Sequence, residues 1–277
     1  IKKVIMKKTW LNGKTVIISG ASSGIGLETA RQLIDGYGCS VIGIAQNIAK
    51  LTKAKELLGS NFSYYSFDIK SEENWKNFRD NLLEKGIIPD ILINNAGILP
   101  RFSRFEKYTD REIEDVLRIN FLSAVYAVRT LLPLIGQSKT PAVINISSSA
   151  ALAPVVGNSL YTASKAALKS FTECLQLESK ERYVAFVCPG FVKTDIFRNQ
   201  SSGISDSKLI ERFCSPCEKT VRKLVRKIAK KKKRIIVGAD AYWSDIAYRL
   251  FPRSVGKIIG SVLKKSKQNI FSGIFEE

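Results

Sequence analysis

A tyrosine and a lysine lie four positions apart in the stretch YTASK, residues 161–165, with small residues between them. On a helix, Tyr161 and Lys165 would share one face. A lysine cation held beside a phenol stabilises the phenolate and lowers its pKa. The pair could therefore move a proton in an active site, although the same spacing also occurs on ordinary helix surfaces.

Histidine is absent from the 277 residues of the chain. This absence excludes catalytic Ser-His-Asp and Cys-His arrangements and the HExxH zinc motif. Five cysteines are scattered along the chain, and Cys214 and Cys217 have no second CxxC pair, so we expect no metal site and a reducing compartment. Proton transfer must then use Tyr, Lys, Cys or a carboxylate, which makes Tyr161 a stronger candidate.

A glycine-rich turn, ISGASSGIG at residues 18–26, follows the first apolar run. Gly20, Gly24 and Gly26 permit a tight turn and let the backbone approach a pyrophosphate at the N-terminus of the next helix. The spacing differs from GxGxxG, and no Gly-Lys-Ser/Thr follows, which excludes a Walker A loop. The turn could bind a dinucleotide or could be a plain glycine turn.

Short apolar runs alternate with amphipathic stretches along the chain. Strands are predicted at 14–20, 39–45, 61–69, 90–97, 142–148, 182–190 and 233–238. Helices are predicted at 25–35, 49–58, 71–86, 109–134 and 159–180, and after residue 218. This alternation predicts an α/β fold with a Rossmann-type doubly wound parallel sheet in a single domain, 10–238, followed by a basic helical C-terminal extension, 239–277. The Gly- and Ser-rich loop at 190–208 is a candidate mobile segment over the site.

Four motifs occur in order on these predicted elements. They are SGASSGIG at 19–26, NNAG at 94–97, NISSSA at 145–150 with YTASK at 161–165, and PGFVKTD at 189–195. Together they resemble the short-chain dehydrogenase/reductase family from about Lys14 to Gly238, with Ser19 replacing the family's usual threonine. The resemblance implies hydride transfer between a nicotinamide cofactor and a carbonyl or secondary alcohol.

The resemblance implies four catalytic residues. Tyr161 would be the general acid/base, and Lys165 would lower the pKa of Tyr161 and hold the nicotinamide ribose. Ser148, thirteen residues before the tyrosine, would hydrogen-bond the substrate carbonyl, with Ser147 and Ser149 as weaker candidates. Asn120 would support a water relay to the lysine. These residue types suit ketone reduction, which needs a proton donor and a group that polarises the carbonyl.

The implied cofactor site draws on several segments. The residues expected in it are Gly20, Ser22, Ser23, Gly24, Ile25, Gly26, Gln46, Asn47, Asp68, Ile69, Asn94, Ala96, Gly97, Tyr161, Lys165, Pro189, Gly190, Val192 and Thr194. Asparagines of the NNAG motif also tie the sheet together in this family. Asn95, and in part Asn94, therefore have a purely structural alternative.

The end of the second predicted strand, Ala45-Gln46-Asn47, bears on the choice of coenzyme. NAD enzymes place an acid there to hold the ribose 2′-hydroxyl, and this chain has none. Ser22, Ser23, Gln46 and Asn47 could hydrogen-bond a 2′-phosphate, although the arginine that many NADP-dependent members carry is also missing. We therefore expect NADP, with NAD as the alternative.

Positive charge is concentrated near the C-terminal end. Residues 219–277 hold 16 Lys and Arg against 4 Asp and Glu, in a chain of net charge +19. The apolar and basic segments of the extension could lie on an anionic membrane surface, cover the substrate pocket or form a subunit interface. No recognition motif accompanies the charge, so we expect no nucleic-acid binding.

Apolar residues near the site favour a hydrophobic ketone, steroid or lipid-like substrate. They are Ile98, Leu99, Phe191, Ile196 and Phe197. We expect a cytoplasmic homodimer or homotetramer that is able to bind membranes peripherally. The alternative is a catalytically inactive cofactor-binding or membrane-associated scaffold, which would have no physical need for all four catalytic residues.

Overall fold

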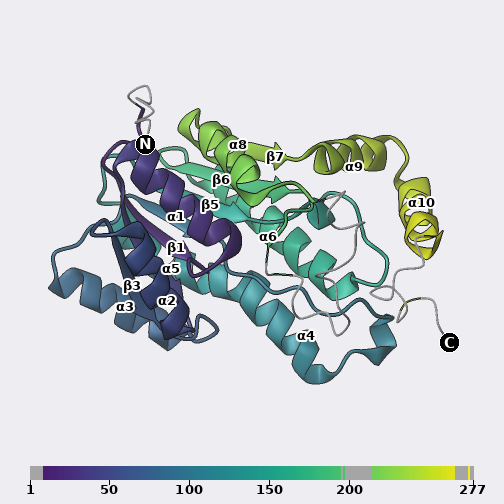
Figure 1. Cartoon of the computed structure of the whole chain (residues 1–277), viewed down its shortest axis with the longest axis horizontal. Coiled ribbons are helices and arrows are strands. Elements are labelled where there is room, and N and C mark those ends of the chain that lie inside the picture. Colours follow the sequence, from purple (N-terminus) through teal and green to yellow (C-terminus); the bar gives the residue numbers. More distant parts are fainter. Residues whose placement is uncertain (1–8, 195, 197–213, 266–273, 275–277) are drawn as a thin grey trace.

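The computed structural model describes residues 9–194, 196, 214–265 and 274. Seven strands in these residues form one parallel sheet with the order β3-β2-β1-β4-β5-β6-β7. The strands are β1 Thr15–Ser19, β2 Ser40–Ala45, β3 Phe62–Ser66, β4 Ile91–Asn94, β5 Ala142–Ile146, β6 Tyr183–Pro189 and β7 Arg234–Val237. This arrangement confirms the predicted doubly wound sheet (Figure 1).

Helices cover both faces of the sheet (Figure 1). One apolar core contains residues of α1 (Gly24–Tyr37), α2 (Ile48–Leu58) and α8 (Cys217–Ala229), and a second contains residues of α3 (Glu72–Glu84), α5 (Ser123–Ile135) and α6 (Ser159–Glu178). Successive residues of β1 alternate between the cores: Val16 and Ile18 belong to the first, and Ile17 to the second. Both faces of the strand are therefore buried, which explains the continuous apolar runs in the sequence.

The helix predicted at 109–134 is interrupted. It consists of α4 (Asp110–Leu117), a π-helical turn over Arg118–Leu122, and α5. A π turn departs from the regular hydrogen-bond ladder and often marks a functional position. The stretch Asp110–Ile135 is long and apolar enough to cross a membrane, but half of it is buried and α5 packs in the second core. Its apolar composition is therefore explained by packing against the sheet.

The sheet has a crevice where the strand order reverses. β1 pairs with β2 on one side and with β4 on the other, so the following connections leave toward opposite faces. The hydroxyl of Ser19, at the end of β1, accepts hydrogen bonds from the backbone N–H groups of Asn95 and Ala96, both at 3.1 Å. These bonds join the glycine loop to the NNAG segment at this crevice.

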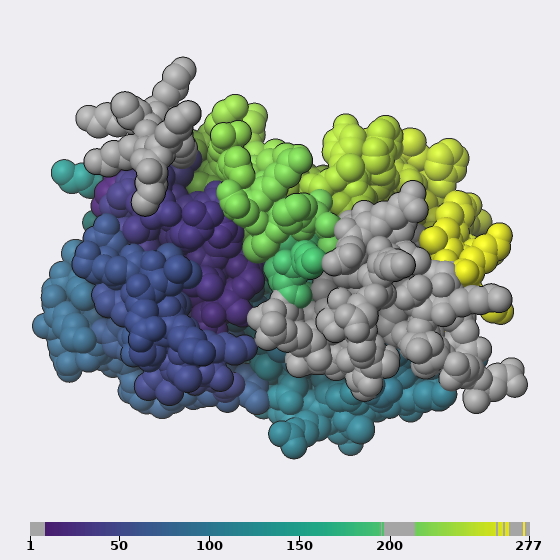
Figure 2. All heavy atoms as spheres, in the orientation of Figure 1, coloured from purple at the N-terminus to yellow at the C-terminus, as the bar shows by residue number. Residues whose placement is uncertain are grey.

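The strands are shorter than the predicted ranges, and the difference is largest for β3 and β4. β3 ends at Ser66 and β4 at Asn94, which leaves Asp68, Ile69 and most of NNAG in loops at the carboxyl edge of the sheet. Most of the loop expected at 190–208 lies outside the described residues. After β7 the chain forms α9 (Ala239–Leu250) and α10 (Pro252–Lys265), which lie at the end of the molecule opposite α2 and α3 (Figures 1 and 2).

Candidate active site

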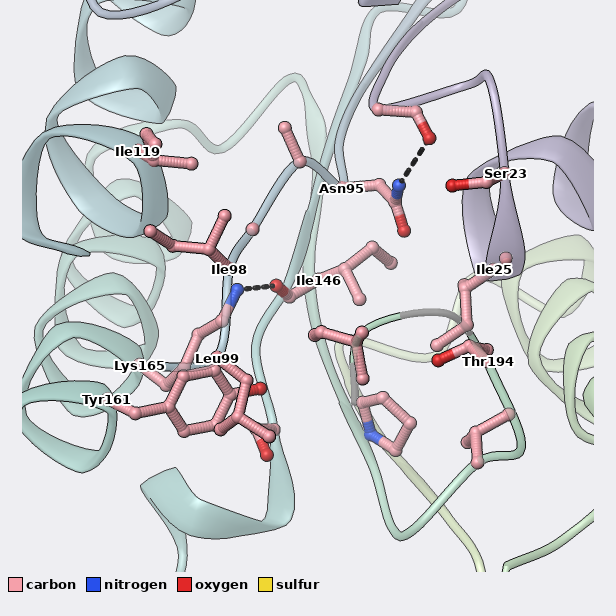
Figure 3. Close-up of a pocket in the computed structure, with 18 of the residues that line it drawn as sticks. Ser23, Ile25, Asn95, Ile98, Leu99, Ile119, Ile146, Tyr161, Lys165 and Thr194 are labelled. Atoms are coloured by element: carbon pink, nitrogen blue, oxygen red, sulfur yellow. Dashed lines mark hydrogen bonds between the residues drawn. The ribbon is translucent and has the colours of Figure 1, made fainter. Parts of the chain in front are cut away.

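A cavity of about 560 Å³ lies at the carboxyl edge of the sheet. Its lining comes from the loops after β1, β2, β3, β4, β5 and β6 and from α6. Every site residue predicted from the sequence lines this cavity except Gly26, Asn94 and Asn120. Figure 3 shows Tyr161 and Lys165 on one side of the cavity and Ser23, Ile25 and Thr194 on the other.

Gly26 lies behind the lining and makes room for it. A Cβ atom on Gly26 would lie 2.2 Å from the carbonyl oxygen of Gly20 and 2.5 Å from Nδ2 of Asn95. Asn95 donates from Nδ2 to the carbonyl oxygens of Ser19 and Gly20, at 3.0 and 3.2 Å. Gly26 thus allows α1 to pack against the loop that Asn95 holds, and its place beside the pyrophosphate stays a prediction.

Asn94 is buried and ties the sheet together. Its Nδ2 donates to Oδ1 of Asn145 on β5 at 2.8 Å, and Asn145 donates in turn to the hydroxyl of Thr172 on α6 at 2.8 Å. Asn94 thus has a structural contact and does not line the cavity, while its role at the cofactor stays a prediction. Its neighbour Asn95 has a structural role too, yet it does line the cavity.

Asn120 stands in the π-helical turn and fixes the segment after NNAG. Its Oδ1 accepts from the backbone N–H of Ile98 at 2.8 Å, and its Nδ2 donates to the carbonyl oxygen of Ile98 and the hydroxyl of Ser164, at 2.9 and 3.1 Å. A Cβ on Gly97 would lie 3.1 Å from Nζ of Lys165 and 3.3 Å from Oδ1 of Asn120. Asn120 therefore lies beside Lys165, with only a glycine between them.

Lys165 is almost fully buried, with 3% of its surface exposed. Its ammonium donates to the carbonyl oxygen of Ile146 at 3.1 Å, and it lies 5.9 Å from the ring centroid of Tyr161 (Figure 3). Burial lowers the pKa of Lys165 to about 8, because a low-dielectric surrounding disfavours the cation. The side chain is thus still mostly protonated at neutral pH.

Burial also raises the pKa of Tyr161, and a hydrogen bond with Ser148 opposes that rise. This net direction is the reverse of the one expected from Lys165, because burial outweighs the other influences. The hydroxyl of Ser147 donates to the carbonyl oxygen of Lys165 at 2.8 Å, which gives it a structural role. The geometry therefore favours Ser148 as the serine that acts together with Tyr161.

Sequence reasoning did not identify Lys50 and Asn158, which line the cavity, or Asp240, which supports one of its segments. Lys50, in the first turn of α2, follows Gln46 and Asn47 and lines the cavity, but a lone lysine on a helix carries no pattern that marks it as a coenzyme ligand. The Asp240 carboxylate, on α9, accepts from the backbone N–H of Phe191 at 2.7 Å and fixes the segment expected at the nicotinamide without lining the cavity itself. Asn158 is buried in the lining, and its Oδ1 has no hydrogen-bond partner among the residues that the structure describes. The proximity of Asn158 to Tyr161 in sequence was the only available signal.

Asp240 also explains why residue 190 is a glycine. A Cβ on Gly190 would lie 2.1 Å from Oδ2 of Asp240, so only glycine fits beside that carboxylate. The backbone N–H of Gly190 donates to the carbonyl oxygen of Val237 at 2.8 Å. The segment after β6 is thus held by β7 and by the first turn of α9.

Comparison with known proteins agrees with this geometry. Residues 14–205 match the family model described as short chain dehydrogenase. The chain is a short-chain dehydrogenase/reductase. It is 32% identical over 218 residues to an 11-beta-hydroxysteroid dehydrogenase-like protein of Arabidopsis thaliana, covering 76% of this chain and 70% of the relative. It is also 30% identical over 214 residues to the ketoacyl reductase HetN of Nostoc sp., covering 73% of this chain and 74% of that protein.

A solved structure shares the fold of this short-chain dehydrogenase. An alcohol dehydrogenase from Thermococcus sibiricus in complex with 5-hydroxy-NADP superimposes with a TM-score of 0.72, covering 82% of this chain and 97% of that one at 22% identity. Family membership makes the chain an oxidoreductase that binds a nicotinamide cofactor and a small-molecule substrate. It also argues against the inactive scaffold considered above.

Proposed function

We propose that this enzyme uses NADP to interconvert a hydrophobic ketone and its secondary alcohol. The observation that carries the proposal is that Ser148, Tyr161 and the buried Lys165 line one cavity together with the glycine loop. The nicotinamide, when bound, supplies or accepts the hydride. Ser148 polarises the carbonyl by donating a hydrogen bond to its oxygen, and Tyr161 delivers the proton from its hydroxyl.

The surroundings of the pair serve this proton transfer. The Lys165 ammonium, held by the carbonyl oxygen of Ile146, stabilises negative charge on the phenol oxygen as the proton leaves. Asn120 keeps the Ile98 backbone in place next to Lys165. Gly20, Ser22, Ser23 and Gly24 would hold the pyrophosphate at the N-terminus of α1, whose N-cap Ser23 has no side-chain capping bond.

The choice of NADP is supported by the polar groups at the end of β2. Gln46, Asn47 and Lys50 line the cavity there, and no carboxylate follows the strand directly. A 2′-phosphate could pair with the Lys50 ammonium, whereas an acid at this position would repel it. We expect kcat/KM to be higher with NADPH than with NADH, and a preference for NADH would contradict the coenzyme assignment while leaving the chemistry intact.

A hydrophobic substrate is supported by the apolar side chains around the catalytic pair. Ile98, Leu99, Phe102, Val155 and Ile196 line the cavity there. Phe197, also expected at the pocket, lies outside the described residues. The names of the relatives, a hydroxysteroid dehydrogenase-like protein and a ketoacyl reductase, agree with such a substrate.

The function is tested by nicotinamide absorbance with a panel of alkyl ketones, cyclic ketones, ketosteroids and 3-ketoacyl esters. We expect oxidation of NADPH with at least one apolar class and none with small charged keto acids. Binding of NADPH without turnover on any member of the panel would contradict the proposed activity.

We also propose that α9 and α10 bind an anionic membrane surface. Large apolar side chains on and between these helices are exposed, namely Tyr242, Trp243, Leu250, Phe251, Ile258 and Val262. The same segment carries Arg249, Arg253, Lys257, Lys264 and Lys265. Aromatic and basic side chains together favour a negatively charged lipid headgroup region.

Cosedimentation with phosphatidylserine-containing vesicles tests this surface. We expect binding that is lost with neutral vesicles and in the double variant Trp243→Ser, Phe251→Ser. Leu177→Ser, at an 80% exposed leucine on α6, is the matched control and should bind as the wild type does. No binding by the full chain would discard the membrane role.

A cytoplasmic location and a homodimer or homotetramer remain predictions. The oligomeric state can be measured by light scattering.

A further inference from the structure

The C-terminal extension returns to the catalytic end of the cavity at Ile274. This side chain is buried, with 5% of its surface exposed, and it packs in one apolar cluster with Leu99 and Phe102. Its carbonyl oxygen accepts a hydrogen bond from Nε of Arg104 at 3.1 Å. Ile274 is thus fixed both through its side chain and through its backbone.

Ile274 packs against two segments, residues 99–108 and 155–157, which are joined to each other by hydrogen bonds. The hydroxyl of Tyr108 and the backbone N–H of Ser103 both donate to the carbonyl oxygen of Gly157, at 3.1 and 2.9 Å. Gly157 has a φ of +74°, which favours glycine, and a Cβ there would lie 2.2 Å from Cδ1 of Ile274. The Ile274 side chain therefore fills space that only a glycine leaves open.

The same two segments form the substrate end of the cavity. Leu99 and Phe102 come from the segment after β4, and Val155 comes from the turn before α6. All three line the cavity and belong with Tyr161 to the cluster that contains Ile274. Ile274 thus lies directly behind the apolar lining on the Tyr161 side, away from the glycine loop.

We propose that Ile274 is a specificity-determining residue that limits how large an apolar substrate fits beside Tyr161. The inference rests on the proposed ketone reduction and adds to it a residue from outside the catalytic motifs. In an apolar pocket, one methylene group changes discrimination between substrates by ~10-fold or more. Ile274 backs Leu99 and Phe102, so removing three of its carbons lets those side chains recede and lengthens the substrate end.

The first test compares Ile274→Ala with Ile88→Ala, at an isoleucine that is 46% exposed and lies outside the cavity lining. For a series of methyl ketones of increasing chain length, we expect the ratio of kcat/KM for long over short ketones to rise by ~10-fold in Ile274→Ala. The control should keep the wild-type ratio. The dissociation constant of NADPH should be unchanged in both, because the substitution lies at the substrate end.

The second test does not require activity. Ile274→Cys and Ile88→Cys are treated with a maleimide, and modification at each position is followed by peptide mass spectrometry. We expect slow labelling at 274 and fast labelling at 88. Equal labelling rates would show that the side chain at residue 274 is not buried. This result would overturn the inference, whether or not any ketone is reduced.

Together, the two tests distinguish failure of the specificity role of Ile274 from failure of the proposed ketone reduction. Protection of residue 274 with an unchanged ketone ratio would overturn the specificity role while leaving ketone reduction standing. If the wild type reduces no ketone, the proposed function fails. In that case the inference is tested by calorimetry of long-chain apolar ketones. Binding to Ile274→Ala that is no tighter than binding to the wild type would overturn the inference as well.

Discussion

Burial acts on the two titrating side chains of the catalytic pair in opposite directions. It raises the pKa of Tyr161 and lowers that of Lys165, because the charged form of each is the one that loses hydration. The ordinary values of the two groups are 10.0 and 10.5, so burial moves the two pKa values apart and places that of Lys165 below that of Tyr161. Shifted pKa values of this kind are typical of residues at functional sites.

Replacing Tyr161 with phenylalanine removes the proton donor but keeps the ring. We expect Tyr161→Phe to lower kcat by at least ~100-fold, the lower range for loss of a general acid/base. The dissociation constant of NADPH should change little. Tyr242→Phe, at an exposed tyrosine on α9, is the control. Near-normal turnover by Tyr161→Phe on the physiological substrate would contradict its assignment.

The preference for NADPH can be tested by removing the charge of Lys50. We expect Lys50→Ala to raise KM for NADPH by ~10-fold or more, since a hydrogen bond to a charged group contributes about 1.5–3 kcal/mol. KM for NADH should stay constant. Lys53→Ala, an exposed lysine on the same helix that does not line the cavity, should leave both values unchanged. Equal effects on the two coenzymes would exclude a 2′-phosphate contact.

The lowered pKa of Lys165 predicts a pH-dependent stability. Between the folded value of about 8 and the ordinary value of 10.5, the unfolded chain binds more protons at this group, so its unfavourable contribution shrinks as pH rises. We expect the free energy of unfolding of the wild type, relative to Lys165→Met, to increase by about 2 kcal/mol from pH 7 to pH 9.5. Urea titrations measure this difference, with Lys230→Met as an exposed control. A pH-independent difference would contradict the burial effect.

At the scale of helices and strands, the sequence was most informative where both faces of an element are buried. Continuous apolar runs placed the inner strands β1, β2, β4, β5 and β6, and residues such as Val16, Ile17 and Ile18 show why. The π-helical turn at Arg118–Leu122 was not predicted, because the apolar spacing on either side of it is compatible with one uninterrupted helix. Asn120 was placed only through the family resemblance.

The contact between α1 and the glycine loop depends on Gly26. A Cβ would collide with the Gly20 carbonyl group, which is backbone and cannot turn aside. We expect Gly26→Ala to lower the free energy of unfolding by about 1–3 kcal/mol, as overpacking does, and to weaken NADPH binding. Gly256→Ala, in α10 with no atom within 4 Å of the added Cβ, is the control and should be neutral or slightly stabilising. Equal stability of the two variants would contradict this packing role.

At the scale of the whole molecule, the extension is joined to the catalytic part. Asp240 holds the segment after β6, and Ile274 packs behind the substrate end. The boundary expected at residues 238 and 239 stays a prediction, but these contacts cross it. Neither could be foreseen from the sequence, because a lone aspartate and a lone isoleucine carry no local pattern that reveals a distant partner.

The family model covers residues 14–205, whereas Asp240 and Ile274 lie beyond it. Under the proposed role of Ile274, substrate fit is divided between the extension and the lining residues Leu99, Phe102 and Val155 inside the matched range. Under such a division, mutations in the extension can alter which alcohol or ketone is accepted while Ser148, Tyr161 and Lys165 stay constant. Evolutionary divergence of substrate range within this lineage would then be read in the extension, and a search for natural variants with new substrates should begin there.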